Sequence, residues 1–478
     1  MSRNIDRRRF EKKFAACLAA VLFILVSLAV SSGESSSGRR PKFIFIFLAD
    51  GAGLTHLETA RMYNRSLHGE GFQIVDKIFQ EGTLGLITTH SDDSLTTDSA
   101  AAATAMANGC KAKNTVVGIC ADGRRTLSVM EVAKKTGLKL GLITNSTIYD
   151  ASPAAFASHV PSRNLSVQII DAYLRLEPDL LMGGGREQLL RPSQGGGSGK
   201  DSEDFVTLFK NRGYAYLSGR QDLDGVKGPR VLGLFSPREM SFELDRERGG
   251  EPSLTDMTRV ALEFLQRDDQ GFVLFVENEN VDSAAHLSDV ASVIHELREL
   301  DRAVGLAHEF YLRHSRETLI LVISDHETGG LNLTAGVRGE GRGRAGRVMP
   351  SKESLRRIGA IKISIRRALE ILGKNPKAED VEKLMADHFP GFSLSPRLKE
   401  MLIANEIPGP TFYADWRAAL LGAMVAQNTQ AYWIGRGHTN QPVFVGALGA
   451  GAERFRGYQD NTDFAKHLFD ILEKKEKP

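Results

Sequence analysis

The chain has 478 residues and a mass of 52.4 kDa, with 42% hydrophobic and 25% charged residues. These values are typical of globular proteins, so they exclude a disordered chain, a collagen-like fibre and a membrane protein with many spans. The net charge is +2, but nine of the 61 basic residues and only three of the 59 acidic residues precede residue 43. The 52 basic and 56 acidic residues that remain carry a net charge of −4, which argues against nucleic acid as the main partner.

The first 33 residues have the pattern of an export signal. A basic stretch, residues 1–13, precedes an uncharged apolar run, residues 14–30, and small polar residues follow. A single membrane anchor is the alternative, because 20 uncharged residues, 14–33, are just long enough to span a bilayer. Residues 7–12 are also similar to a twin-arginine signal. We therefore expect a periplasmic or extracellular protein, or one that this segment alone anchors to a membrane.

Apolar runs that read as buried strands alternate with helical patterns along the rest of the chain. The runs are residues 42–48, 138–143, 180–182, 271–276, 318–323 and 442–448. The helical patterns are residues 99–107, 125–136, 165–175, 253–267, 288–314 and 460–474. This alternation predicts an α/β fold with a mainly parallel central sheet covered by helices on both faces, and a ligand site at the carboxyl ends of its strands. We expect one catalytic domain over residues 41–335 and 430–475, with a helical insertion, residues 336–430, over or beside the site.

Two cysteines remain after the predicted signal. Cys110 and Cys120 are ten residues apart, across a segment that contains glycine. In an oxidising compartment they can form one small disulfide, and the alternative is two buried thiols. The sequence leaves both open.

Acidic and histidine side chains gather next to the ends of the predicted strands. They are Asp50, Glu277, Asp282, Asp325, His326 and His438. Asp282 and His286 are four residues apart on one helical face and can reach one cation, although an ordinary exposed pair is the alternative. A second Asp-His pair, Asp387 with His388, lies in a helical pattern with no strand before it and reads as surface.

Ser99 is the candidate nucleophile. Asp98 is a natural helix N-cap, so Ser99 lies in the first turn of a helix, where backbone N–H groups stabilise negative charge. A capped, buried helix without catalytic function is the alternative. A neighbouring divalent cation would deprotonate the serine hydroxyl without a histidine base.

Asp150, Ser152 and Arg163 complete the candidate site. The oxygens of Asp150 and Ser152 suit a hard cation such as Mg²⁺, and Arg163 offers a forked donor to phosphate. Each also has a simpler interpretation, as a helix cap, a turn residue or a surface charge.

Together these segments resemble the alkaline phosphatase family, whose motifs occur in family order from about residue 42 to residue 474. The matching stretches are residues 47–53, 97–101, 150–154 with Arg163, 277–286, 325–326 and 437–439. One departure is Ser283, which stands where many relatives carry Lys or His. The resemblance implies an enzyme that hydrolyses small phosphate monoesters at alkaline pH, and it leaves a homodimer possible.

The resemblance also implies a role for each matching residue. Ser99 would be the nucleophile that becomes phosphorylated, and Arg163, oriented by Asp98, would hold the phosphoryl oxygens. One zinc ion would be held by Asp282, His286 and His438. A second zinc ion would be held by Asp50, Asp325 and His326. A magnesium ion would be held by Asp50, Ser152 and Glu277, with Asp150 in or near its coordination shell.

Three other functions compete with this one. A sulfatase needs its nucleophile in a Cys/Ser-x-Pro-x-Arg context, whereas four alanines follow Ser99. Phosphodiesterase relatives commonly use Thr and lack the magnesium acids and the clamping arginine, although diesterase activity can remain as a side reaction. An exported, non-catalytic zinc or phosphate binder would not need Ser99 beside a complete set of ligands.

Overall fold

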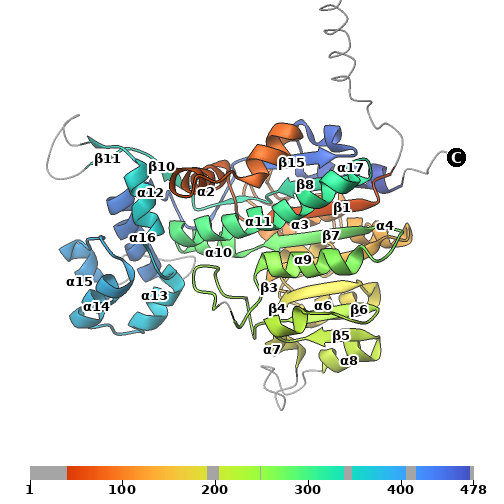
Figure 1. Ribbon diagram of the computed structural model, residues 1–478, viewed down its shortest axis with the longest axis horizontal. Coiled ribbons are helices and arrows are strands. Elements are labelled where there is room, and N and C mark those ends of the chain that lie inside the picture. Colours follow the sequence, from red (N-terminus) through yellow and green to blue (C-terminus); the bar gives the residue numbers. More distant parts are fainter. Residues whose placement is uncertain (1–39, 191–203, 248, 338–346, 405–415, 474–478) are drawn as a thin grey trace, which may run out of the picture. The chain divides into compact units, whose positions relative to one another are not determined.

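The computed structural model describes residues 40–190, 204–247, 249–337, 347–404 and 416–473 (Figure 1). The predicted export signal, residues 1–33, lies outside these ranges, as do residues 338–346 and 405–415 of the predicted insertion. Within the described part, no helix has both the length and the apolar character needed to cross a membrane.

Ten strands of the described chain form one central sheet. In sheet order they are β16 (Gly457–Gln459), β2 (Thr83–Ile87), β15 (Val443–Gly449), β8 (Thr318–Ile323), β1 (Phe43–Ala49), β7 (Phe272–Asn278), β3 (Lys139–Thr147), β4 (Leu180–Gly184), β6 (Arg230–Leu234) and β5 (Tyr214–Leu217). All pairings among them are parallel except those of β15, which runs antiparallel to β8 and β2. The predicted mainly parallel sheet is therefore confirmed, and the six predicted strands are β1, β3, β4, β7, β8 and β15.

Four strands of this central sheet have no counterpart in the prediction. They are β2, β5, β6 and β16. β5 and β16 are the outermost strands, and β5 and β2 have partly exposed side chains. The two edge strands are short and lack the continuous apolar run that marks a strand buried on both faces, whereas β2 and β6 each lie one place inside the edge.

Strand β1 shows how the sheet separates two hydrophobic cores. Phe45 and Phe47 point to one face, whereas Ile44 and Ile46 point to the other, as the two-residue period of a strand requires. The first face is covered by α2 (Leu54–Leu67), α9 (Leu254–Leu265) and α11 (Val290–His314), and Figure 1 shows α9 and α11 in front of the strands. The second is covered by α3 (Ser99–Asn108), α4 (Val129–Lys135), α6 (Ser166–Leu176) and α17 (Asn461–Leu472).

The direction of β15 brings its preceding residues to the carboxyl edge of the parallel strands. Because β15 is antiparallel to β8, the start of β15 lies beside the end of β8. The short strand β14 (His438–Thr439) pairs there with β9 (Glu327–Thr328), with His438 opposite Thr328. A histidine that precedes a strand thus meets acids that follow other strands.

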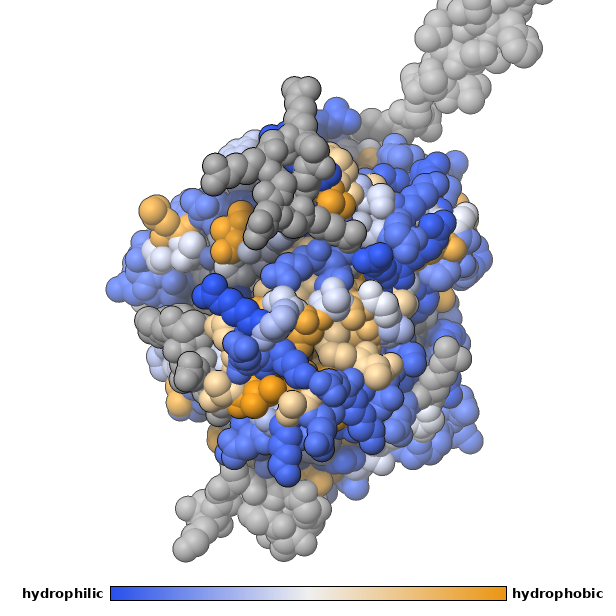
Figure 2. Space-filling model, turned by 90° about the vertical axis from the view of Figure 1, so that its left-hand side faces the viewer, coloured by the Kyte–Doolittle hydropathy of each residue, from blue (hydrophilic) through white to orange (hydrophobic). Residues whose placement is uncertain are grey.

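The described part of residues 336–430 is mostly helical and lies outside the large sheet. It comprises α12 (Lys352–Gly359), α13 (Ile365–Leu372), α14 (Ala378–His388), α15 (Pro396–Ala404) and α16 (Trp416–Thr429), which gather at the left of Figure 1. Seen from that side, apolar side chains gather near the middle of the face, with hydrophilic ones around them (Figure 2). Asp387 is exposed at the end of α14, as the sequence predicts.

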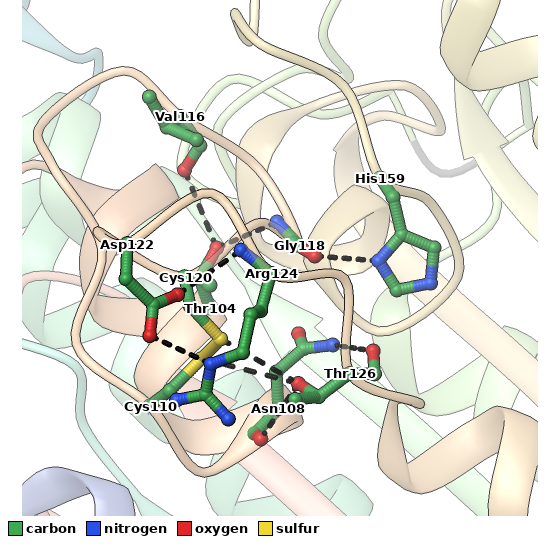
Figure 3. Close-up of a disulfide and its surroundings, with 10 residues drawn as sticks. All are labelled: Thr104, Asn108, Cys110, Val116, Gly118, Cys120, Asp122, Arg124, Thr126 and His159. Carbon is green, nitrogen blue, oxygen red and sulfur yellow. Dashed lines mark hydrogen bonds and ion pairs between the residues drawn. A yellow bond between two sulfur atoms is a disulfide. The ribbon is translucent and has the colours of Figure 1, made fainter.

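Cys110 and Cys120 form a disulfide, which decides between the two alternatives left by the sequence (Figure 3). The cross-linked loop packs on the segment that follows α5 (Ala151–Ala155), because Val117 forms an isolated β-bridge with Val160. The backbone N–H of Arg163 donates to the carbonyl of Thr115, 2.8 Å away. The disulfide loop thus supports the chain that leads to Arg163.

Candidate active site

The predicted site residues come from separate segments of the chain and meet at the carboxyl edge of the sheet. Asp50 follows β1 directly, Glu277 lies near the end of β7, and Asp325 with His326 follows β8. Asp282 and His286 lie on the short helix α10 (Asn280–His286), and Ser99 is the first residue of α3.

One group that can hold a metal ion consists of Asp50, Asp325 and His326. Their ligand atoms all lie within 4.8 Å of one another, and their side chains are at most 3% exposed. Nε2 of His326 is 3.2 Å from Oδ2 of Asp325 and 3.6 Å from Oδ1 of Asp50. Neither of these two carboxylate oxygens has a hydrogen-bond partner in the described chain. Buried oxygens without donors are costly unless a cation fills the space between them.

A second group consists of Asp282, His286 and His438. Nε2 of His286 is 3.0 Å from Asp282 and 3.1 Å from Nε2 of His438. Nδ1 of His286 donates to the Arg436 carbonyl, and Nδ1 of His438 donates to the Thr97 carbonyl, at 2.5 and 2.7 Å. Because each backbone carbonyl accepts the proton of Nδ1, Nε2 can bind a cation and faces the group. Metal-binding histidines are usually held in this way.

Ser99 lies beside the first group. Its Oγ is 3.3 Å from Nε2 of His326. The Asp98 side chain caps α3 by accepting from the Ala101 N–H at 3.0 Å, which places Ser99 in the first helical turn. Small alanine side chains let α3 pack closely on α5 and α17, so the serine is only 5% exposed. The hydroxyl therefore has a fixed position next to a potential cation.

An oxygen-only group lies on the other side of Asp50. Oδ2 of Asp50 accepts from the Ser152 hydroxyl at 3.3 Å, and Thr144 donates to Oε2 of Glu277 at 2.5 Å. Oε1 of Glu277 is buried and has no partner among the described residues. The two oxygens of Asp50 thus face different groups. Oδ1 faces the group of nitrogen and oxygen ligands around His326, and Oδ2 faces the group of oxygen ligands alone.

Arg163 is held by two carboxylates. Nη1 lies 3.3 Å from Oδ2 of Asp98, and Nη2 lies 2.9 Å from Oδ1 of Asp150. Asp150 also caps α5 and accepts from the Ser146 hydroxyl at 2.6 Å. The contacts of Asp150 are thus to Arg163 and its own segment, whereas Ser152 contacts Asp50 directly.

Burial and the charges of neighbouring groups shift the pKa values of the carboxyl groups at the site. Burial, followed by the charge of Asp325, raises the pKa of Asp50 well above its usual range. Burial raises the pKa of Asp325 to about 7, and burial with the charge of Asp150 raises the pKa of Glu277. Burial also opposes ionisation of Asp282, but the charges of His286 and His438 outweigh it and hold its pKa well below the usual range. Divalent cations would relieve the repulsion, so the residues fit bound metal ions.

Three polar residues at the site were not predicted. Thr144 supports Glu277, and the Thr328 hydroxyl donates to Oδ1 of Asp282. Glu279 accepts from Ser283 at 2.8 Å, keeps one buried oxygen without a partner in the described chain, and has a pKa that burial raises to about 8. Thr328 and Glu279 lie within segments that the sequence marked as site loops, but nothing in their spacing distinguished them.

Comparisons with known proteins agree with this geometry. The family model for alkaline phosphatase matches residues 41–339. Alkaline phosphatase 4 of Bacillus subtilis (strain 168) is 31% identical over 441 residues, which cover 90% of this chain and 88% of the relative. Alkaline phosphatase 3 of the same organism is 30% identical over 483 residues, or 98% of each chain. The chain belongs to the alkaline phosphatase family.

Solved structures of this family have the same fold. The crystal structure of Thermus thermophilus alkaline phosphatase superposes with a TM-score of 0.82, at 27% identity over 91% of each chain. The cold-active alkaline phosphatase of Shewanella sp. gives a TM-score of 0.74 at 26% identity, over 90% of this chain and all of the other. The protein is therefore a phosphatase of a metal-dependent family that acts on phosphate monoesters, and it carries two groups of residues suited to metal ions.

Proposed function

We propose that this phosphatase acts at alkaline pH through a phosphoserine intermediate on Ser99, with two zinc ions and one magnesium ion. The observation that carries the proposal is the 3.3 Å distance between the Ser99 hydroxyl and Nε2 of His326. His326 belongs to a buried group of potential metal ligands. A serine at a helix N-terminus beside such a group has what a metal-activated nucleophile needs.

The donor sets support the choice of metals. Asp282, His286 and His438 would hold one zinc ion, and Asp50, Asp325 and His326 would hold the other, because mixed nitrogen and oxygen sets suit zinc. Asp50, Ser152 and Glu277 would hold magnesium, which prefers oxygen ligands, with Asp150 in or near its coordination shell. When bound, the ions would favour the ionised serine and neutralise charge on the transferred phosphoryl group.

The remaining roles belong to side chains. Oγ of Ser99 would attack phosphorus while the bond to the alcohol oxygen breaks, and the alcohol would leave with a proton from solvent. Water would then cleave the bond between Ser99 and phosphorus, releasing phosphate and restoring the hydroxyl. The Arg163 fork, held by Asp98 and Asp150, would bind two phosphoryl oxygens throughout. Activity should rise above neutral pH, because the serine must lose its proton and the phosphate must be fully charged.

Replacement of the serine tests the nucleophile. Ser99→Ala should abolish release of p-nitrophenol from p-nitrophenyl phosphate while the zinc and magnesium content stays unchanged. Ser241→Ala, at an exposed serine outside the site, is the matched control and should keep full activity. Assays of the bis-ester and of the sulfate, with and without chelator, separate this activity from diesterase and sulfatase activity. Near-normal turnover by Ser99→Ala would refute the assignment.

Three broader expectations belong to the same proposal. Residues 1–33 direct export or anchor the chain, residues 336–430 form an insertion over or beside the site, and the enzyme acts on small monoesters with a homodimer left possible. N-terminal sequencing of the secreted protein and its mass in solution test the first and third. The second expectation is tested by deleting the insertion and comparing the change in KM for bulky monoesters with the change for small ones.

A further inference from the structure

A cavity of about 560 Å³ lies between helices α4 and α6, away from the active site. None of the predicted metal ligands lines it, nor does Ser99 or Arg163. Its walls come from the two helices, from the loop before α4 and from the segment after α5. Its volume is within the range of small-molecule sites, which is about 300–1,000 Å³.

The cavity concentrates positive charge on an otherwise acidic body. Four basic side chains line it, Arg125, Lys134, Lys135 and Arg175, against the single acid Glu131. The local excess is three positive charges, whereas the chain after residue 42 carries a net charge of −4. Such a local excess attracts anions even when the whole protein is negative.

Part of this charge has a structural role. Lys134, Lys135 and Arg175 lie in the last turns of their helices, where cations complement the helix dipole. Lys134 also donates to the carbonyl of Leu176 at the end of α6. His159 is bound on both sides, to Glu131 at 3.0 Å and to the Gly118 carbonyl at 2.5 Å, and Figure 3 shows the contact with Gly118. These groups hold the walls together.

Three cationic side chains of the cavity have no hydrogen-bond or ion-pair partner in the described chain. They are those of Arg125, Lys135 and Arg175, and all three residues are exposed. Arg125 comes from the loop before α4, so the helix dipole does not account for it. Four apolar residues also line the cavity, Leu127, Ala157, Ala172 and Leu176, and this apolar part of the lining is called its floor. Unpaired forked donors around an apolar floor suit a ligand with charged ends and a flat apolar body.

We propose that this cavity, the cationic groove, binds an amphipathic organic anion with at least two negative charges on an apolar or aromatic body. Arg125 and Arg175 would each pair with one oxyanion group, Lys135 would add charge, and the apolar body would cover the alanine and leucine floor. The site would be separate from the catalytic centre, so it does not depend on the proposed function.

Titration calorimetry with naphthalene-1,5-disulfonate tests the groove, because this probe has two fixed charges and no phosphoryl group to hydrolyse. The wild-type protein should bind one equivalent. Arg125→Ala/Arg175→Ala should weaken binding at least tenfold and leave hydrolysis of p-nitrophenyl phosphate unchanged. Lys135→Glu should also weaken it. The matched control Lys383→Ala/Arg397→Ala, on α14 and α15, should bind like the wild type.

Two more measurements distinguish the groove from the active site and from a general anion site. Arg163→Ala should bind the probe normally, and loss of binding in that variant would move the probe to the active site and overturn the proposal. Sulfate should bind at least tenfold more weakly than the probe, because it cannot use the apolar floor. Equal affinity for sulfate, no binding by the wild type, or unchanged binding by Arg125→Ala/Arg175→Ala would each refute the amphipathic groove.

Discussion

Replacement of Asp325 by Asn should lower the stability of the metal-loaded protein and raise the stability of the chelated protein. In the described chain, Oδ1 of Asp325 accepts from the N–H groups of Gly51 and His326, at 3.1 and 2.9 Å. The Asn oxygen keeps both bonds. The new amide nitrogen takes the place of Oδ2, which is 3.2 Å from Nε2 of His326. The amide can therefore donate a hydrogen bond to Nε2. The variant thus removes a charge without leaving a backbone donor unsatisfied.

The size of the effect follows from the pKa of Asp325. Burial raises this pKa from an ordinary value of 3.8 to about 7, so the folded, chelated protein opposes ionisation. Since the folded pKa lies above the unfolded one, stability falls as pH rises from about 4 to about 7, and the full cost is present above pH 7. At 1.36 kcal/mol for each pKa unit, that cost is at most about 4 kcal/mol at pH 8 and about 2 kcal/mol at pH 5.

Urea unfolding measures the stability of the chelated and of the zinc-loaded protein. In chelator at pH 8, Asp325→Asn should raise the free energy of unfolding by about 1–4 kcal/mol, with a smaller gain at pH 5. With zinc, the same variant should be less stable than the wild type and bind zinc at least about tenfold more weakly, because an anionic ligand is lost. Asp387→Asn alters the exposed Asp-His pair on α14 and should change neither state. If Asp325→Asn destabilises the chelated protein at pH 8, the argument from the raised pKa of this buried carboxyl is wrong.

Three further predictions concern the phosphate clamp, the third metal and the disulfide. Arg163→Ala should lower kcat/KM about 100-fold and weaken inhibition by inorganic phosphate, since two charge-assisted bonds are lost; an unchanged inhibition constant would contradict the clamp. Thr144→Val should raise the magnesium concentration needed for half-maximal activity about tenfold without altering zinc content, and Thr144→Ser should restore it. Cys110→Ala/Cys120→Ala should lose up to about 3 kcal/mol in urea unfolding, the loop-closure term for a sequence separation of 10, while kcat stays near normal. Equal stability of the variant and the oxidised wild type would show that the cross-link constrains little.

The sequence alone determined the buried strands and the candidate residues at their ends. Runs such as residues 319–323 are apolar at every position, a local property that tertiary packing does not need to supply. The Asp98 cap and the place of Ser99 in the first helical turn are equally local. Family resemblance then assigned a role to each of these residues.

Only the tertiary structure decided which partners they have. The antiparallel pairing of β15 brings His438 to the acids, and no feature of residues 442–448 reveals that direction. The contacts of Thr144 with Glu277, of Asp150 with Arg163, and the pairing of the two cysteines are likewise set by the packed chain. Secondary structure follows from patterns of a few neighbouring residues, whereas these contacts depend on how the sheet and its helices assemble.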